Sequence, residues 1–234
     1  MTELLYLHDS YTKESDATVV KAEGKRIVLD KTCFYPGGGG QPRDKGPIEK
    51  EGEKFEIINA KKEGNDVVLE VDKEGLSSGD NVHVTIDWDY RYKLMRMHTA
   101  AHIIDAVLYK EANALCTGNQ LGAEKSRIDF SLEVLDMDKM KKYFEEANEL
   151  AKRGIEVKIY FMKREEALKI PGIVKLAAVM PPAVEELRIV EIPGIDIQAD
   201  GGTQVKNTKE IGTIELLSVE NKGKSNRRVY FTVQ

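Results

Sequence analysis

The chain has 234 residues, of which 41% are hydrophobic and 32% are charged, and 35 basic against 40 acidic residues give a net charge of −5. This length allows one large domain or two modest ones in a soluble globular protein. No apolar run approaches the roughly 20 residues needed to span a bilayer, so no membrane segment is expected. Two cysteines, Cys33 and Cys116, are too few for a disulfide scaffold or a cysteine-only zinc site, which predicts a reduced, cytoplasmic protein. The acidic balance argues against bulk coating of nucleic acid but allows a local basic patch.

The first third of the sequence predicts a small β domain. Short segments rich in valine and isoleucine are separated by turn signals, at a spacing typical of a barrel or a sandwich. The expected strands are Ala17–Ala22, Arg26–Asp30, Phe55–Lys61, Asp66–Val71 and Asn81–Ile86. The pattern ends at Asp87, which is the best candidate for a domain boundary.

The remainder of the chain predicts a mixture of helices and strands. From Trp88 to about Ala114, apolar residues recur at helical spacing, and Asp87 or Asp89 could be the N-cap. A second amphipathic helix is expected over Asp136–Arg153, with Gly154 as its stop. Without regular alternation of strands and helices, the α+β class is favoured. Further elements are a short helix at Lys163–Leu168 and strands at Lys125–Glu133, Ile155–Phe161, Leu187–Ile192, Gly212–Val219 and Val229–Val233.

Two histidines four residues apart are the sharpest functional signal. His98 and His102 lie in the segment Arg96–His102 (RMHTAAH) and are half of the four histidines in the chain. On a helix, residues at i and i+4 share a face, so both imidazoles can point at one metal ion. No glutamate follows His98, so the metalloprotease motif is absent. The alternative is one solvated and one core histidine, and the pairing favours the metal.

A third ligand must come from elsewhere in the chain. The segment Asp196–Val205 (DIQADGGTQV) is the best donor, because its glycines allow a tight turn and Asp200 and Gln204 offer oxygen atoms at i and i+4. The alternative is a simple β-turn over Ala199–Thr203. Alone, this signal is weak.

Two further segments have features that could bind a partner. Phe34–Pro42 (FYPGGGGQP) holds four consecutive glycines, which suits close backbone approach or positive φ angles, although a flexible loop is slightly favoured on the pattern alone. No Lys-Ser/Thr follows the glycines, so the segment is not a P-loop. Asn221–Arg228 (NKGKSNRR) places four cations in an expected hairpin turn, which is either a phosphate site or a solvated turn.

Five segments, in this order, resemble the alanyl-tRNA editing family. That family comprises the editing domain of alanyl-tRNA synthetase and the free-standing AlaX proteins. The segments span most of the chain, and together they are more specific than any one of them. Length and the glycine-rich segment resemble the medium-length AlaX type. The segments are Phe34–Gly46, Asp89–His102, Gly122–Phe130, Asp196–Gly212 and Lys222–Arg228.

The resemblance implies a fold, a reaction and a cofactor. It implies a small β-barrel with the glycine-rich loop over residues 1–87, and a two-layer α+β, metal-binding tRNA-editing domain over residues 88–234. The implied reaction is hydrolysis of Ser-tRNA(Ala), and also of Gly-tRNA(Ala), by an aminoacyl-tRNA hydrolase. The implied cofactor is one Zn²⁺ ion, with His98 and His102 as ligands. The long helix and the glycine segment could serve substrate contact or a homodimer.

The chain departs from the family in the second half of this site. The family motif CxxxH supplies a cysteine and a histidine, and here Asp200 and Gln204 stand in their places. A carboxylate can bind zinc at about 2.0–2.2 Å, whereas glutamine is a poor zinc ligand and could leave a position open. Two histidines and one carboxylate also suit other divalent metals.

The remaining roles are expectations about substrate and tRNA contact. Thr99 and Gln204 are expected to line the catalytic pocket with polar groups, because such groups can select serine over alanine. The glycine segment would approach the amino acid or the terminal adenosine through its backbone. Two alternatives remain: a metal-dependent hydrolase of small acyl esters, and a non-catalytic tRNA-binding module. The expected substrate-binding residues are Gly37, Gly38, Gly39, Gly40 and Gln41, and the expected tRNA-binding residues are Arg91, Arg96, Lys222, Lys224, Arg227 and Arg228.

Overall fold

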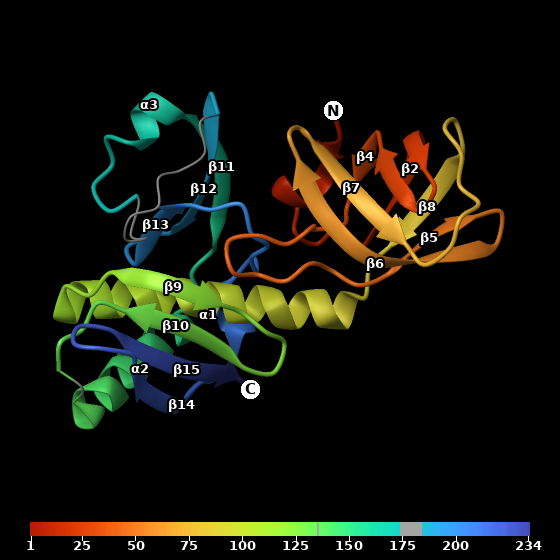
Figure 1. Cartoon of the computed structure of the whole chain (residues 1–234). Coiled ribbons are helices and arrows are strands. Elements are labelled where there is room, and N and C mark those ends of the chain that lie inside the picture. The colour runs from red at the N-terminus through yellow and green to blue at the C-terminus, as the bar shows by residue number, and fades with distance from the viewer. Residues whose placement is uncertain (135, 174–183) are drawn as a thin grey trace. The chain divides into compact units, whose positions relative to one another are not determined.

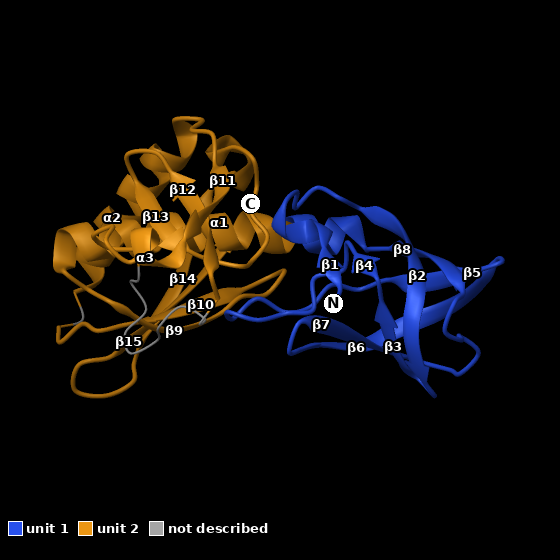
Figure 2. Ribbon diagram, turned by 90° about the horizontal axis from the view of Figure 1, so that it is seen from above, with its two compact units in different colours: residues 1–92 blue, residues 93–234 orange. Residues whose placement is uncertain are grey.

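The computed structural model describes residues 1–134, 136–173 and 184–234. The chain divides into two compact units, residues 1–92 and residues 93–234 (Figure 2). Unit 1 is built around a closed antiparallel β-barrel, and unit 2 combines antiparallel sheets with helices. The predicted α+β class is therefore confirmed. Within the described residues, no helix is both long enough and apolar enough to cross a membrane.

Figure 1 shows the β-barrel of unit 1. Buried residues alternate with more exposed ones along its strands, so every second side chain is directed inward. In β7 (Asp66–Val71), for example, Val67, Leu69 and Val71 are buried while their neighbours are half-buried. A short parallel pair, β1 (Glu3–Leu4) and β4 (Lys31–Thr32), and the 3₁₀ helix η1 (Leu5–Leu7) lie outside the barrel. Around the barrel, the six strands follow one another in the order β2 (Glu14–Glu23), β3 (Arg26–Leu29), β7, β6 (Glu53–Glu63), β5 (Pro47–Lys50) and β8 (Asn81–Thr85).

Unit 2 contains two antiparallel sheets (Figure 1). The larger has the order β14 (Ile214–Asn221), β15 (Arg227–Val233), β10 (Ser126–Phe130), β9 (Cys116–Gln120). The smaller has the order β11 (Lys158–Lys163), β12 (Glu186–Ile192), β13 (Asp196–Ala199). The helices α2 (Met137–Lys152) and α3 (Arg164–Ala167) and the 3₁₀ helix η2 (Thr208–Ile211) complete it.

The long helix α1 (Trp88–Ala112) carries the histidine pair. Its N-cap is Asp87, whose Oδ1 accepts a hydrogen bond from the backbone N–H of Tyr90 at 3.0 Å. The predicted apolar stripe is confirmed, because all of its members lie in the interior. These residues are Leu94, Met97, Ala101, Ile104 and Leu108.

Most predicted elements are present, with shifted ends. Helix α2 begins after Asp136, whose side chain caps it through the N–H groups of Asp138 and Lys139. The strand predicted at Ile155–Phe161 was placed too early, because β11 starts at Lys158. The reason is that Glu156 pairs with Asn207 in an isolated bridge, so this stretch follows a different partner. Strand β13 was not predicted, since polar residues alternate with apolar ones over only four positions.

Candidate metal centre

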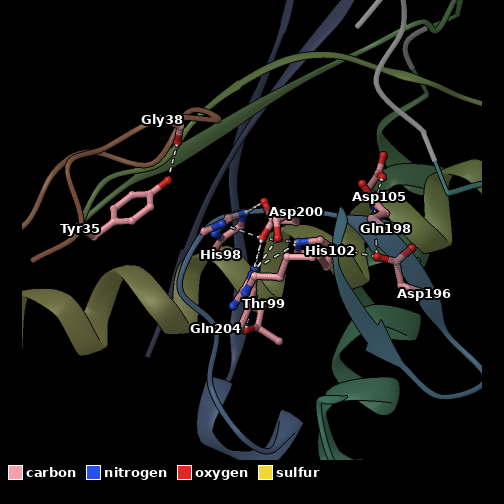
Figure 3. Close-up of polar contacts among 12 residues, drawn as sticks. Tyr35, Gly38, His98, Thr99, His102, Asp105, Asp196, Gln198, Asp200 and Gln204 are labelled. Carbon is pink, nitrogen blue, oxygen red and sulfur yellow. Dashed lines mark hydrogen bonds and ion pairs between the residues drawn. The ribbon is translucent and has the colours of Figure 1, made fainter. Parts of the chain in front are cut away.

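Helix α1 and the segment after β13 bring together the three predicted metal ligands (Figure 3). One ligand atom from each of His98, His102 and Asp200 lies within 4.8 Å of the other two. The Nε2 atom of His98 is 3.6 Å from Oδ1 of Asp200, and Nε2 of His102 is 3.9 Å from Oδ2. Ligands at about 2.0 Å in a tetrahedral site are about 3.3 Å apart, so a small inward rotation would close this triad on an ion.

Local structure explains why these side chains meet. The histidines are one helical turn apart, and their ring centroids are 5.2 Å apart. Asp200 directly follows β13, where its backbone N–H donates to the Arg188 carbonyl and its own carbonyl accepts from the Arg188 guanidinium at 2.7 Å. The Gly202 N–H donates to Oδ2 of Asp200 at 3.0 Å, which forms an Asx-turn. The predicted turn thus fixes the carboxylate.

The triad is nearly enclosed, and this burial shifts its pKa values. Burial lowers the pKa of His98 to about 4, so this imidazole is neutral at physiological pH. Burial also acts to lower the pKa of His102, but the hydrogen bond and charge of Asp196 outweigh it and raise that pKa. Burial acts to raise the pKa of Asp200, but the two imidazoles and the Arg188 guanidinium lower it to about 2. The Asp200 side chain is 17% exposed, against 6% for each histidine, so it is the most exposed member of the triad.

The charges around the triad suit a divalent cation. Among the described residues that contact the triad or its partners, three carboxylates (Asp105, Asp196, Asp200) face one guanidinium, that of Arg188. Among the groups named here carboxylates outnumber the guanidinium, so these surroundings favour a cation. Two imidazoles and a carboxylate are ligands that Zn²⁺ and related divalent ions accept. The residues therefore fit such an ion.

Gln204 lies beside the triad as a hydrogen-bond donor. Its Nε2 atom is 3.0 Å from Oδ2 of Asp200 and 3.2 Å from Nε2 of His102. Its Oε1 accepts a hydrogen bond of 2.7 Å from the hydroxyl of Thr99, which itself accepts from the Val205 N–H. An amide nitrogen is not a metal ligand, so Gln204 in this orientation completes a polar wall and leaves coordination to the triad. Thr99 is fully buried and contacts Gln204, so its hydroxyl acts through that residue.

The prediction from sequence missed the partners of His102 on its other side (Figure 3). Asp196 accepts a hydrogen bond from Nδ1 of His102, with 2.7 Å between the two atoms, and its side chain is 1% exposed. Gln198 contacts both Asp196 and Asp105. A signal was available: Asp196, Gln198 and Asp200 alternate as residues on one face of a strand do, and Asp105 follows His102 by three positions on a helix.

The glycine segment lies in unit 1 and forms an ordered tight turn. Gly38 and Gln41 pair through two backbone hydrogen bonds of 3.0 and 2.9 Å. Gly39 and Gly40 between them have φ values of 57° and 87°, which a two-residue hairpin of type I′ requires. The Tyr35 hydroxyl donates to the Gly38 carbonyl at 3.0 Å (Figure 3). The glycines therefore form a defined turn in the loop between β4 and β5.

Arg91 was expected to bind tRNA, and the structure contradicts this. Its side chain is fully buried in unit 1 and pairs with Asp44, with 2.7 Å between Nε and Oδ1. Its remaining N–H groups donate to the carbonyls of Ser10 and Cys33. A guanidinium with no exposed surface cannot reach a phosphate. Arg96 is half-buried and donates to the carbonyls of Ile211 and Gln234, so it also serves the fold.

The basic turn is the hairpin loop between β14 and β15, as predicted, but its arginines are structural. Arg227 is buried and donates to the carbonyls of Gly223, Asn226 and Glu133. Arg228 forms a two-pronged pair with Asp129, which lowers the pKa of that carboxyl. Lys222 and Lys224 are exposed, and Lys222 pairs with Glu220 at 2.8 Å. Of the six expected tRNA contacts, only these two lysines lie on open surface.

Comparison with known families places both parts of the chain among domains of tRNA synthetases. Residues 2–90 match the family of class II (A) tRNA synthetases. Residues 187–230 match the threonyl and alanyl tRNA synthetase second additional domain. The latter range includes Asp196, Asp200 and Gln204. A barrel unit and an α+β unit with a histidine–carboxylate triad therefore define a synthetase-related protein.

Full-length relatives narrow this class. The chain is 52% identical to the alanyl-tRNA editing protein AlaX-M of Saccharolobus solfataricus and 48% identical to that of Methanosarcina barkeri, over 100% of this chain and at least 99% of each relative. It is 35% identical to the alanine–tRNA ligase of Methanococcus aeolicus, but covers only 25% of that longer protein. The chain belongs to the alanyl-tRNA editing protein family of the AlaX-M type.

Proposed function

We propose that this chain is a trans-editing hydrolase that removes a wrong amino acid, serine and also glycine, from alanine tRNA with the help of one divalent metal ion. The observation that carries the proposal is the triad of His98, His102 and Asp200, in a chain that shares full length with AlaX-M relatives. We further propose that residues 93–234 form the metal-binding editing domain, because the whole triad lies in that unit.

The reaction requires attack of water on an ester carbonyl that is already activated. A divalent ion held by the triad supplies Lewis-acid activation at that carbonyl. The chain's own residues supply enclosure and orientation: the buried imidazoles and the carboxylate would hold the ion, and the partly exposed side of Asp200 is where substrate is proposed to approach. Zinc is the proposed ion, and the oxygen ligand Asp200 also accommodates other divalent ions.

Gln204 and Thr99 are the proposed source of selectivity for serine. The Gln204 amide borders the triad, and Thr99 holds its oxygen, so the Nε2 donor is directed at the site. With an ion bound at Nε2 of His102, the amide hydrogen that now faces this nitrogen can bond the serine hydroxyl instead, and alanine offers no such acceptor. Discrimination then comes from a fixed polar group, since pocket size alone rejects an added hydroxyl poorly.

The proposed tRNA contacts are the exposed lysines of the hairpin turn, Lys222 and Lys224, which can pair with phosphates. The glycine turn Gly37–Gly40 with Gln41 is proposed to meet the aminoacylated end of the tRNA. Backbone groups of a turn without side chains allow close approach of a ligand.

The decisive experiment is deacylation of purified Ser-tRNA(Ala), Gly-tRNA(Ala) and Ala-tRNA(Ala) by the full chain. Hydrolysis of the first two, lost after chelation, restored by Zn²⁺ and absent in His98→Ala, is the expected result. A matched control is His83→Ala, because His83 is half-exposed in unit 1 and contacts only surface acids.

Two other outcomes would replace the proposal. Hydrolysis of a free serine ester as fast as of Ser-tRNA(Ala) would indicate an esterase for small molecules. Tight tRNA binding without any hydrolysis or bound metal would indicate a binding module. Hydrolysis that survives complete metal removal would contradict the metal dependence alone.

A further inference from the structure

His102 is held by a chain of buried polar contacts on the side away from the triad. Asp196 meets its Nδ1 at 2.7 Å. The Gln198 Nε2 atom lies 3.1 Å from Oδ2 of Asp196 and 2.9 Å from Oδ2 of Asp105. Asp196 and Asp105 are both 6% exposed. One amide group therefore donates to two buried carboxylates and links strand β13 to helix α1.

The spacing of these residues along β13 and α1 explains why their side chains meet. Asp196 and Gln198 are i and i+2 on β13, so both point to the same face. His102 and Asp105 are i and i+3 on α1, so both lie on one side of the helix. The strand continues directly to Asp200, a member of the triad. The same two elements thus carry the candidate ligands and the groups behind them.

A hydrogen bond to Nδ1 fixes which nitrogen of His102 is available. When Nδ1–H donates to Asp196, the lone pair of Nε2 faces the triad. The contact of 3.2 Å from the Gln204 amide nitrogen to Nε2 agrees with this tautomer, because the amide is a donor and needs an acceptor there. A carboxylate behind a histidine also increases the negative potential at the metal position.

We propose that Asp196, Gln198 and Asp105 form a positioning network that orients His102 and, through two buried negative charges, sets the affinity of the triad for a divalent cation. The inference rests on the proposed function in one respect, since it requires that the triad binds an ion. None of the three residues is placed in contact with the substrate, so they are positioning residues. Their effect should appear in metal affinity before it appears in chemistry.

The experiment measures Zn²⁺ affinity by competition with a chromophoric chelator, without tRNA, for the full chain and three isosteric variants. Asp196→Asn keeps a hydrogen-bond acceptor for Nδ1–H but removes the charge, and should weaken Zn²⁺ binding about 10- to 100-fold. Asp105→Asn, one step further away, should weaken it by a smaller factor. Glu111→Gln is the matched control, because it removes the same charge from α1 at a site paired with Lys110 outside the network.

The order of the three changes in Zn²⁺ affinity tests the proposed network. Weakening that falls from Asp196→Asn through Asp105→Asn to an unchanged Glu111→Gln supports the network. Thermal unfolding of the metal-free proteins separates this from a structural role, since a lowered Tm with unchanged Zn²⁺ affinity would overturn the inference. If Asp196→Asn does not fold, equal affinities of Asp105→Asn and Glu111→Gln would also overturn it. Failure of the unaltered chain to bind Zn²⁺ or Co²⁺ would instead overturn the proposed metal dependence, and the network's role with it.

Discussion

Replacing Arg91 with methionine should destabilise unit 1 strongly. The substitution keeps a long side chain but leaves the Asp44 carboxylate, which is fully buried, without its counter-charge. It also removes the hydrogen-bond donors of the Ser10 and Cys33 carbonyls. Asp44 accepts from the Tyr35 N–H at 2.6 Å at the base of the glycine turn, so disorder there should follow.

These contacts set the expected loss in the free energy of unfolding. Breaking a buried ion pair by removing one partner costs about 3–5 kcal/mol. Loss of the Arg91 donor to each of the two carbonyls adds about 1–3 kcal/mol. A loss of this size is a large share of the roughly 5–15 kcal/mol that stabilises a domain. The double variant Arg91→Met with Asp44→Asn removes the unpaired charge, and should therefore be about 3 kcal/mol more stable than Arg91→Met alone.

Urea unfolding followed by tryptophan fluorescence measures this directly, because Trp88 is the only tryptophan in the chain and packs on the barrel core. With a slope of about 1–3 kcal/mol per molar urea, the recovery in the double variant is a midpoint shift of about 1–3 M. Burial already raises the pKa of Asp44 while Arg91 opposes this, so loss of Arg91 should raise it further. A raised folded pKa costs stability as pH rises above the unfolded value, so the deficit should shrink near pH 4. A midpoint for Arg91→Met equal to that of the unaltered chain at pH 7, or a double variant no better than the single, would refute the reasoning.

Three further predictions concern the site and the surface. Gln204→His places an imidazole where the amide now lies and should tighten Zn²⁺ binding at least about tenfold, since a fourth ligand, the third nitrogen, completes a tetrahedral set. Unchanged affinity in a chelator competition would show that this position does not face the ion. Thr99→Val should reduce the preference for Ser-tRNA(Ala) over Ala-tRNA(Ala) by about 10- to 100-fold, because buried polar groups lose their hydrogen-bond partner, while Thr99→Ser should retain the preference. If the ratio of kcat/KM for Ser-tRNA(Ala) to that for Ala-tRNA(Ala) is the same in both variants, Thr99 has no part in the selectivity. The double variant Lys222→Ala with Lys224→Ala should weaken tRNA binding and reduce the slope of log Kd against log salt by about one for each phosphate that a lysine no longer neutralises. The control pair Lys61→Ala with Lys62→Ala in the barrel should leave this slope unchanged. Identical slopes for the two pairs would show that the basic turn is only a solvated loop.

The histidine pair could be predicted from sequence because its signal is local. Helical periodicity fixes the face on which residues four apart lie, so His98 and His102 had to point the same way. Asp200 was found because the glycines after it indicate a turn next to an oxygen donor. Neither inference needed knowledge of distant contacts. The same holds for the N-cap at Asp87, one of the two aspartates predicted for that role, where one side chain closes its own helix.

The burial and pairing of the expected tRNA-binding arginines could not be predicted, for the opposite reason. A sequence shows that a residue is cationic but not which buried carboxylate lies opposite it. Arg91 pairs with Asp44, which lies 47 residues away in the sequence, and Arg228 pairs with Asp129, which lies 99 residues away. Arginine suits such pairs, because its planar donors match a carboxylate, while lysine remains hydrated at the surface. In this chain the two lysines of the basic turn are exposed, whereas Arg227 is buried and Arg228 lies partly buried against Asp129.

The resemblance drawn from sequence places an aspartate and a glutamine where the family motif has a cysteine and a histidine, and this exchange would change the character of the proposed metal site. Asp200 in place of cysteine retains one negative charge among the ligands, but it presents two hard oxygens, one directed to each histidine. Gln204 in place of histidine removes a nitrogen ligand and adds a donor that bonds this carboxylate. Charge at the site is thus preserved while softness and ligand number fall. Selectivity for zinc over other divalent ions should therefore be weaker here than in a site with a thiolate. The carboxylates of Asp196 and Asp105, which lie on the far side of His102, should then contribute more to the affinity for the ion.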